Sequence, residues 1–343
     1  MGVVVSIEGT SPTNRRSLNQ LTIALAVMVI VAAVVFGVTV FSGSSGPTKL
    51  AASYQCVPGQ LIPQLKPGES GSMSTSYGNF TATYRATMPR TAQINGLNNG
   101  TPFDGKLTVT DGGTTWTLAK PDNGTVSQIN EMCVIAFQPE TTPGVMIEGF
   151  TGGAHCCETP VIYLFNHAEN RYVKVVDMTP IDFENPHSFD TNGGFIPTVV
   201  GHQVLLQTGD DAFDYTFGCY ACGIDPIVLD SVGFGGLTDV TLQHPAQVGA
   251  NAAEMWKYVQ SSVKAEGDAD ARVIPYPFGF VAPWVADECA LGHGASAWSK
   301  VEQLSREGKL SNALYYQATM THHSFVPYLH SFLLHHDYCI GQI

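Results

Sequence analysis

The feature that most constrains this chain is an uncharged, almost wholly aliphatic run near its N-terminus. Residues 21–41 contain no charged side chain. At about 1.5 Å of rise per residue, a helix of this length spans a hydrocarbon core of about 30 Å. Arg15 and Arg16 precede the run, and the next basic residue is Lys49. Because basic flanks stay in the cytoplasm, the run predicts one transmembrane helix with the rest of the chain outside the membrane.

A cleavable signal peptide is the main alternative interpretation of this run. The apolar part of a signal peptide is usually about 7–15 residues long, which is shorter than residues 21–41, and no clear small-x-small site follows Phe41. The polar flanks and terminal position oppose a third interpretation, a buried core helix. We therefore expect a cytoplasmic tail over residues 1–20, a membrane helix over 21–41 and a flexible Gly/Ser-rich linker over 42–50.

The negative charge of residues 51–343 opposes binding to nucleic acid. The sequence has 16 basic and 29 acidic residues, of which three basic and one acidic precede residue 51, so residues 51–343 carry a formal charge of −15. Such a surface repels phosphate backbones. We expect no nucleic-acid partner.

All of the cysteines lie beyond the apolar run. They are Cys56, Cys133, Cys156, Cys157, Cys219, Cys222, Cys289 and Cys339. An even number of cysteines in an exported chain predicts disulfides. We expect one bridge between Cys289 and Cys339, because Cys289 shares an apolar helix face with Val281 and Val285 while Cys339 follows the last predicted helix.

Two sequence patterns divide the outer part of the chain. Over residues 51–245, short β-branched and aromatic runs alternate with turns such as Asp111-Gly112-Gly113, which predicts strands. The runs are 80–84, 106–110, 114–118, 134–137, 161–165 and 172–176. From residue 246 the spacing becomes helical. The apolar faces are Trp256/Val259/Val263, Val281/Val285/Cys289, Trp298/Val301/Leu304 and Phe325/Leu329/Phe332/His336. We expect a mainly β fold of stacked hairpin or sheet units, sandwich- or propeller-like, followed by a helical subdomain over 246–343.

Two segments of the β-rich part repeat the same order of features. Each has a strand, a polar loop, a cysteine pair and a second strand. The first runs from Val145 through Cys156-Cys157 to Leu164, and the second from Val204 through Cys219-x-x-Cys222 to Leu229. The echo predicts two similar β-hairpin units that stack side by side.

The first of these segments carries a recognisable motif, Thr151-Gly-Gly-Ala-His155-Cys156-Cys157. It resembles the T-G-G-A-H-C-C signature of uncharacterised exported bacterial proteins that are labelled VCBS- or FG-GAP-repeat-like. The resemblance extends over about residues 75 to 340 and implies an exported β-rich fold, but no activity. FG-GAP-type loops bind calcium through a series of acidic ligands. The matching turn at 190–194 lacks the third ligand and a closing acid, so we expect a solvated turn there.

The paired cysteines are also the strongest candidates for chemistry. His155, Cys156, Cys157, Cys219 and Cys222 could form one zinc or copper site if the two units pack in register. Disulfides are the favoured interpretation, because an oxidised cysteine lacks the thiolate that a metal needs. Pairing across the two units and pairing within each unit both stay open. A redox-active Cys219-x-x-Cys222 would need a helix N-terminus, and strand-like residues surround it instead.

The remaining site candidates are His155, Asp210 and Asp211, which lie in the loops of the two units and could line a ligand site. The C-terminal histidines (His322, His323, His330, His335 and His336) read as a solvated surface. We expect a single-pass, membrane-anchored protein of the cell envelope that is non-catalytic, needs no cofactor and binds a partner protein or a ligand. The alternatives are an envelope-polymer hydrolase using loop carboxylates or a Cys/His metal site, and a structural subunit of a membrane assembly.

Overall fold

The computed structural model describes residues 51–59, 66, 68–87, 104–118, 128–139, 141–150, 158–177, 194–213, 216–218, 224–265, 277–312, 315 and 322–343. The predicted cytoplasmic tail, transmembrane helix and linker lie outside these residues. Among the helices that are described, none is long and apolar enough to cross a membrane. The chain from Lys49 onward forms one compact unit.

The first sheet is a four-stranded antiparallel meander in which each strand pairs with the next. Its strands are β2 (Ser70–Tyr77), β3 (Phe80–Thr87), β4 (Asp104–Asp111) and β5 (Thr114–Thr117). β4 leads into β5 through Gly112 and Gly113, whose φ angles of 52° and 111° suit glycine and strain other residues. The Asp-Gly-Gly turn expected from the sequence is confirmed.

The second sheet has five strands in the order β1-β6-β7-β8-β9. They are β1 (Ser53–Pro58), β6 (Gln128–Ala136), β7 (Gly144–Phe150), β8 (Glu158–Asn166) and β9 (Arg171–Asp177). β6 to β9 form a meander like that of the first sheet, and β1 adds to its edge beside β6.

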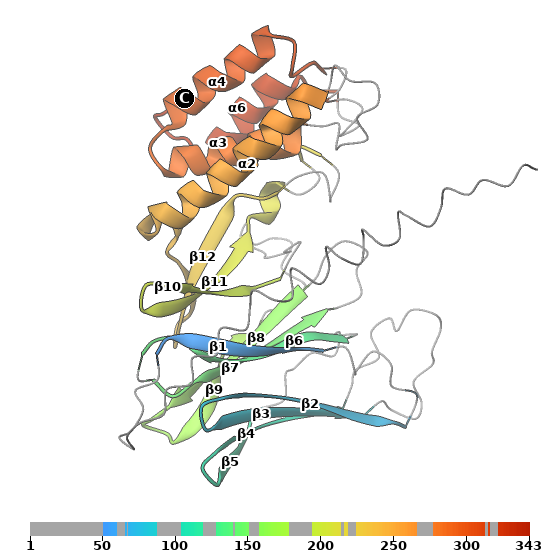
Figure 1. Cartoon of the computed structure of the whole chain (residues 1–343), viewed down its shortest axis with the longest axis vertical. Helices are drawn as coiled ribbons and strands as arrows, with labels where there is room; N and C mark the ends of the chain where they lie inside the picture. Colours follow the sequence, from blue (N-terminus) through green and yellow to red (C-terminus); the bar gives the residue numbers. More distant parts are fainter. Residues whose placement is uncertain are drawn as a thin grey trace, which may run out of the picture. The chain divides into compact units, whose positions relative to one another are not determined.

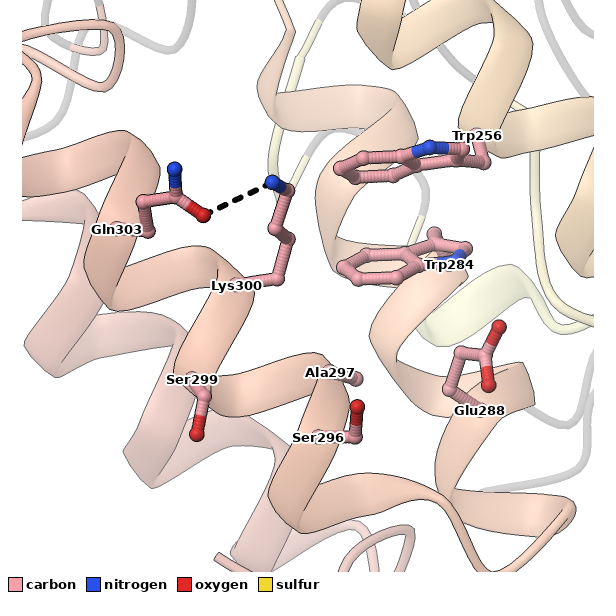
Figure 2. A pocket seen from close by; sticks show the side chains of 8 residues that line it. All are labelled: Trp256, Trp284, Glu288, Ser296, Ala297, Ser299, Lys300 and Gln303. Carbon is pink, nitrogen blue, oxygen red and sulfur yellow. Dashed lines mark hydrogen bonds between the residues drawn. The ribbon is translucent and has the colours of Figure 1, made fainter.

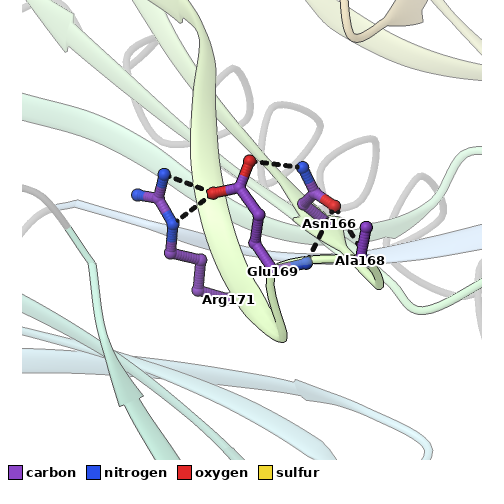
Figure 3. A network of polar contacts seen from close by, with 4 residues as sticks. All are labelled: Asn166, Ala168, Glu169 and Arg171. Atoms are coloured by element: carbon purple, nitrogen blue, oxygen red, sulfur yellow. Dashed lines mark hydrogen bonds and ion pairs between the residues drawn. The ribbon is translucent and has the colours of Figure 1, made fainter.

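A network of exposed polar groups closes the turn between β8 and β9 (Figure 3). The Asn166 side-chain oxygen accepts hydrogen bonds from the backbone N–H groups of Ala168 and Glu169, at 3.0 and 3.2 Å. The Asn166 amide and the Arg171 guanidinium both donate to the Glu169 carboxylate. Such local bonds replace the ladder where the chain reverses, and Asn170 adopts a positive φ of 49° there. The network therefore fixes a turn and is not a site.

The third sheet is again a four-stranded meander, in the order β10-β11-β12-β13. Its strands are β10 (Ile196–Val200), β11 (Gln203–Gly209), β12 (Ile227–Gly233) and β13 (Gly236–Asp239). The described strands thus form three antiparallel sheets, so the expectation of a mainly β fold is confirmed (Figure 1).

The second sheet has an apolar core on each of its faces. Ile147 of β7 packs into a core shared with Leu107 of the first sheet. Its neighbour Met146 points to the opposite face and packs into a core shared with Leu206 of the third sheet. This alternation follows from the two-residue period of a strand. The third sheet in turn shares a core with the helices, in which Leu229 of β12 and Val248 belong to one buried apolar cluster.

The two segments that echo each other in sequence are both antiparallel hairpins. β7 pairs with β8, and β11 pairs with β12. Met146 and Ile162 of the first hairpin share a core with Val204 and Leu206 of the second, so the expected stacking of the two units is present. Cys156, Cys157, Cys219 and Cys222 lie in connections outside the described residues, and their pairing stays a prediction.

The chain changes from strands to helices after Asp239. The longer helices are α2 (Pro245–Ala265), α3 (Phe278–Ala290), α4 (Gly294–Arg306) and α6 (Phe325–His335), which gather together in Figure 1, and two short 3-10 turns are η1 (Asp211–Phe213) and η2 (Thr241–Gln243). Every residue of α3 from Phe278 to Asp287 is buried. A helix that is apolar all round belongs in a core, and α3 contacts α2, α4 and α6.

The predicted apolar helix faces are confirmed with one correction. Val259, Val281, Val301 and Leu329 are buried in one core that all four long helices share. His336 does contact the last apolar face, with its ring centroid 4.3 Å from that of Phe332, but it lies just beyond the end of α6 and is exposed.

Two disulfides join described residues. Cys289 at the end of α3 bonds to Cys339 after α6, which confirms the bridge expected from the sequence. Cys56 of β1 bonds to Cys133 of β6, directly opposite in the ladder. None of these four cysteines is free.

Candidate functional site

A pocket of about 320 Å³ opens between three helices of the helical subdomain (Figure 2). α2 contributes one tryptophan, α3 a tryptophan and a glutamate, and α4 a row of small and polar side chains. The lining residues are Trp256, Trp284, Glu288, Ser296, Ala297, Ser299, Lys300 and Gln303. The volume is at the lower end of the range of about 300–1,000 Å³ that is typical of ligand pockets.

Two indoles that pack against each other at a tilt form one wall of this pocket. The rings of Trp256 and Trp284 lie 4.4 Å apart between centroids, with an angle of 37° between their planes. Trp284 is only 7% exposed because it belongs to the buried helix α3, whereas Trp256 is half-buried on the flank of α2. Neither indole N–H hydrogen-bonds to another described residue. Burial fixes the position of the Trp284 ring, and its contact with Trp284 positions the Trp256 ring.

A lysine lies at one end of the indole pair. The Lys300 ammonium is 5.8 Å from the centroid of a Trp256 ring, within range of a cation–π interaction. It also donates a 2.9 Å hydrogen bond to the side-chain oxygen of Gln303, one turn along α4. Among the described residues it has no carboxylate partner in an ion pair. The ammonium therefore keeps donor capacity for a ligand.

A carboxylate lies at the other end. Figure 2 shows Glu288 beyond Trp284, on the side away from Lys300. One Glu288 oxygen lies 3.0 Å from Nδ1 of the exposed His293, and Glu288 itself is half-buried. The pocket thus places an acceptor-only group and a donor-only group on opposite sides of an aromatic surface.

One serine of the pocket is not oriented as a nucleophile. The Ser299 hydroxyl donates to the backbone carbonyl of Ala295 at 2.9 Å, a bond that points it back along its own helix. A serine nucleophile would instead need a base within hydrogen-bond reach. A pocket with aromatic walls and a few convergent polar groups is the ordinary form of a small-molecule site.

A second polar cluster lies where the third sheet meets the helices. Asp210, just after β11, accepts hydrogen bonds from the Ala212 N–H at 2.9 Å and from the Tyr338 hydroxyl. Burial and the nearby Asp210 carboxylate raise the pKa of Tyr338, so the hydroxyl stays protonated and donates. The predicted ligand-site residue Asp210 therefore has a structural role in the described residues: it holds η1 and the chain after α6 together.

Asp287 is the most deeply buried carboxylate of this cluster, at 2% exposure on α3. It accepts a 2.8 Å hydrogen bond from the Asn251 amide of α2 and another from the backbone N–H of Ile227. Burial raises the pKa of Asp287 to about 7, although both hydrogen bonds act in the opposite direction. One carboxylate thus joins α2, α3 and the start of β12.

The other predicted site residues fall into three groups. Asp211 begins the turn η1 next to Asp210. His155, Cys156, Cys157, Cys219 and Cys222 lie outside the described residues, so the metal and redox hypotheses on them stay untested. Among the histidines near the C-terminus, His323 stacks on Tyr328 and His330 packs against Trp298, so these two rings contact different aromatic side chains.

One group of described residues has metal-ligand types close together. It consists of Cys56, Glu131 and Cys133, with ligand atoms within 4.8 Å of one another. Both cysteines are joined in a disulfide, so neither offers a thiolate.

The pocket was not found from the sequence. The helical spacing placed Trp256 on an apolar face, but Trp284 and Lys300 come from two other helices, and their meeting depends on how the helices cross. Asp287 could have been found from the sequence, because it is an acid that follows the apolar stretch Phe278–Val285 within the same predicted helix.

No protein-family model, curated protein or solved structure matches this chain. The resemblance of residues 151–157 to the T-G-G-A-H-C-C signature stays a prediction, because none of these comparisons bears on it. The function is therefore inferred from the geometry of the pocket and from the sequence.

Proposed function

We propose that this chain is a single-pass, membrane-anchored protein of the cell envelope whose extracytoplasmic domain binds a ligand or partner in the tryptophan pocket without catalysis. The observation that carries this proposal is the pocket itself. The indole pair of Trp256 and Trp284 is flanked by Lys300 and Glu288, and the Ser299 hydroxyl of the pocket is bonded to the backbone.

Export is supported by the cysteine chemistry of the described residues. The two bridges, Cys56–Cys133 and Cys289–Cys339, are of a kind that forms and persists in oxidising compartments. The uncharged run at 21–41 with basic residues before it supplies the means of anchoring. In this proposal the N-terminus is cytoplasmic and residues 51–343 lie outside the membrane.

The stacked sheets support a propeller-like rather than a simple two-sheet architecture. Each of the three sheets contains four consecutive antiparallel strands, and the second packs one face on the first sheet and the other on the third. Successive four-stranded meanders stacked in this way are the building plan of propeller blades. We propose that the helical subdomain covers the last of these units and presents the binding pocket.

The test has two arms on the full-length protein. A protease added outside intact cells should degrade the chain beyond about residue 45, and a protected C-terminal part would contradict export. A pull-down from membranes solubilised in a detergent without sugar should then compare the wild type with Trp256→Ala. Tyr258→Ala is the matched control, because Tyr258 is an exposed aromatic of the same helix outside the pocket. Capture that is lost only with Trp256→Ala supports the proposal, and capture equal in all three contradicts it.

A further inference from the structure

The short turns of the three sheets lie together at one end of the strands. In each four-stranded meander the first and third turns fall at the same end, because successive strands are antiparallel. Two hydrogen bonds align these ends across the sheets. The Tyr77 hydroxyl donates to the Ala51 carbonyl at 2.9 Å, and the Val204 N–H donates to the Phe137 carbonyl at 2.8 Å. We call this the turn end; its turns are 78–79, 112–113, 137–143, 167–170, 201–202 and 234–235.

The chain that follows the predicted membrane helix enters the domain at the turn end. β1 begins at Ser53, which lies opposite Ala136, the residue before the turn 137–143. Residues 42–52 separate the predicted helix from β1. A flexible linker of this length has an end-to-end distance of about 20 Å. In the proposed topology the turn end is therefore held close to the outer surface of the membrane.

The third sheet carries an exposed phenylalanine at this end. Phe234 is 63% exposed and lies between Gly233 and Gly235, at the tip of the β12–β13 hairpin. A Cβ added to either glycine would meet nothing within 4 Å, so the tip stands clear of the rest of the described chain. Val199, just before the turn 201–202 of the same sheet, is 50% exposed. The turn end thus has an apolar tip on the third sheet.

The charge of the turn end permits contact with lipid head groups. Residues 51–343 carry a net charge of −15, but the six turns and the residues that flank them contain one basic and three acidic residues, a net charge of −2. The segments 200–203 and 233–236 of the third sheet contain no charged residue. Repulsion between exposed charges is screened over about 10 Å, so the acidic excess elsewhere does not hold this tip away from a membrane.

We propose that the turn end rests on the membrane and that Phe234 inserts between the lipid head groups and the acyl chains. This inference rests on the proposed function, because it requires the membrane anchor. Burying a phenylalanine side chain favours the buried state by about tenfold or more. The anchor makes the contact intramolecular, so one inserted ring is sufficient to orient the domain.

The test measures contact with lipid in the full-length protein, reconstituted into phosphatidylcholine nanodiscs. Phe234→Trp places an indole at the tip. Leu242→Trp is the matched control, because Leu242 is 74% exposed and follows β13 at the opposite end of the third sheet. Lipids with brominated acyl chains quench an indole that reaches them, and subtracting the wild-type emission isolates each added tryptophan. We expect several-fold stronger quenching at position 234 than at position 242.

A second set of variants separates insertion of the ring from nearness to the linker. Val199→Trp places the reporter indole at the turn end while Phe234 is kept. Adding Phe234→Ser should reduce quenching of this reporter by about tenfold, whereas adding Leu242→Ser should leave it unchanged. Since Phe234 is mostly exposed, Phe234→Ser should keep the thermal midpoint of the domain.

Strong quenching at position 234 that depends on the Phe234 ring in the Val199 reporter supports the inference. Equal quenching at positions 234 and 242 overturns it, and so does reporter quenching that persists with Phe234→Ser. If either occurs while the membrane pull-down still depends on Trp256, the orientation is wrong and the proposed function stands. If alkaline carbonate releases the full-length chain from membranes, the anchor is absent and both are wrong.

Discussion

The hydroxyl of Tyr338 donates a hydrogen bond to the Asp210 carboxylate across 128 positions of the chain. Tyr338 follows the last helix, and Asp210 follows β11 of the third sheet. Phe213, in the turn that Asp210 holds, packs edge-on against the Tyr338 ring at 5.3 Å between centroids. This bond and ring contact tie the helical subdomain to the sheet beneath it, which keeps the tryptophan pocket in a fixed position on the domain.

Removing the hydrogen bond between Tyr338 and Asp210 should destabilise the fold. We expect Tyr338→Phe to lower the free energy of unfolding by about 1–3 kcal/mol, because the half-buried Asp210 carboxylate loses a donor. Urea denaturation measures the change. The matched control is Tyr258→Phe, whose hydroxyl makes no hydrogen bond with a described residue and whose ring is 39% exposed. Equal stability of the two variants would contradict the structural role given to Asp210.

Asp287 should make stability depend on pH. Its pKa is raised by burial from an ordinary 3.8 to about 7 in the folded state. The folded protein therefore holds this proton more tightly than the unfolded chain, and the stability it contributes at low pH is lost as the pH rises from about 4 to about 7. The loss from this one group amounts to about 4 kcal/mol. The neighbouring Glu288 carboxylate also raises the pKa of Asp287. Asp210, Asp225 and Asp287 together raise the pKa of the Tyr338 hydroxyl.

The Asp287→Asn variant isolates this effect. The difference in unfolding free energy between variant and wild type should grow in favour of the variant as the pH rises from 4 to 8. The exposed Glu254, which pairs with Lys257, provides the matched carboxyl-to-amide control variant, Glu254→Gln. A constant offset for Asp287→Asn across this range would show that Asp287 does not titrate there.

The Cys289–Cys339 bridge should contribute substantially to stability. It closes a loop with a sequence separation of 50 residues. In the chain-entropy model such a loop contributes about 4 kcal/mol. The double variant Cys289→Ala/Cys339→Ala should therefore show a much lower urea midpoint, and non-reducing peptide maps of the wild type should contain the linked peptides. Free thiols at both positions in the native protein would refute the bridge.

Replacing two helical glycines by alanine should change the stability of the fold in opposite directions. A Cβ on Gly294, at the start of α4, would lie 2.8 Å from the Cys289 sulfur and 2.8 Å from Gln342. Overpacking there should cost about 1–3 kcal/mol. A Cβ on Gly249 of α2 would meet its nearest neighbour, Leu291, at 3.9 Å, an ordinary contact. Gly249→Ala should stabilise by about 0.5–1 kcal/mol through helix propensity. Thermal melts of both variants that shift the same way would contradict the packing described around Gly294.

The local parts of the fold could be predicted because their signals are local. Short β-branched and aromatic runs between turns indicated strands such as β3 and β8, and a 3.6-residue period indicated the faces of Val281 and Leu329. The Cys289–Cys339 bridge followed because one partner lay on an apolar face and the other followed the last helix. His336 contacts Phe332 of the predicted face but is exposed, because the spacing does not reveal that α6 ends one residue before it.

The pocket could not be predicted because its parts come from different helices. Trp256, Trp284 and Lys300 meet only after α2, α3 and α4 have crossed, and crossing geometry depends on the packing of whole helix surfaces. For the same reason the Tyr338–Asp210 bond, which joins segments far apart in the chain, has no sequence signal. Sequence reasoning chose Asp210 as a ligand-site residue because it is an acid in a loop, and the structure gives it a bonded partner instead.

The central claim is that the tryptophan pocket is occupied in the native envelope. Hydroxyl-radical footprinting tests it by comparing oxidation of Trp256 in intact membranes with oxidation in purified protein washed free of small molecules. We predict that Trp256 is protected several-fold in membranes, while the exposed Tyr258 on the same helix oxidises equally in both samples. Equal oxidation of Trp256 in the two samples would contradict the claim.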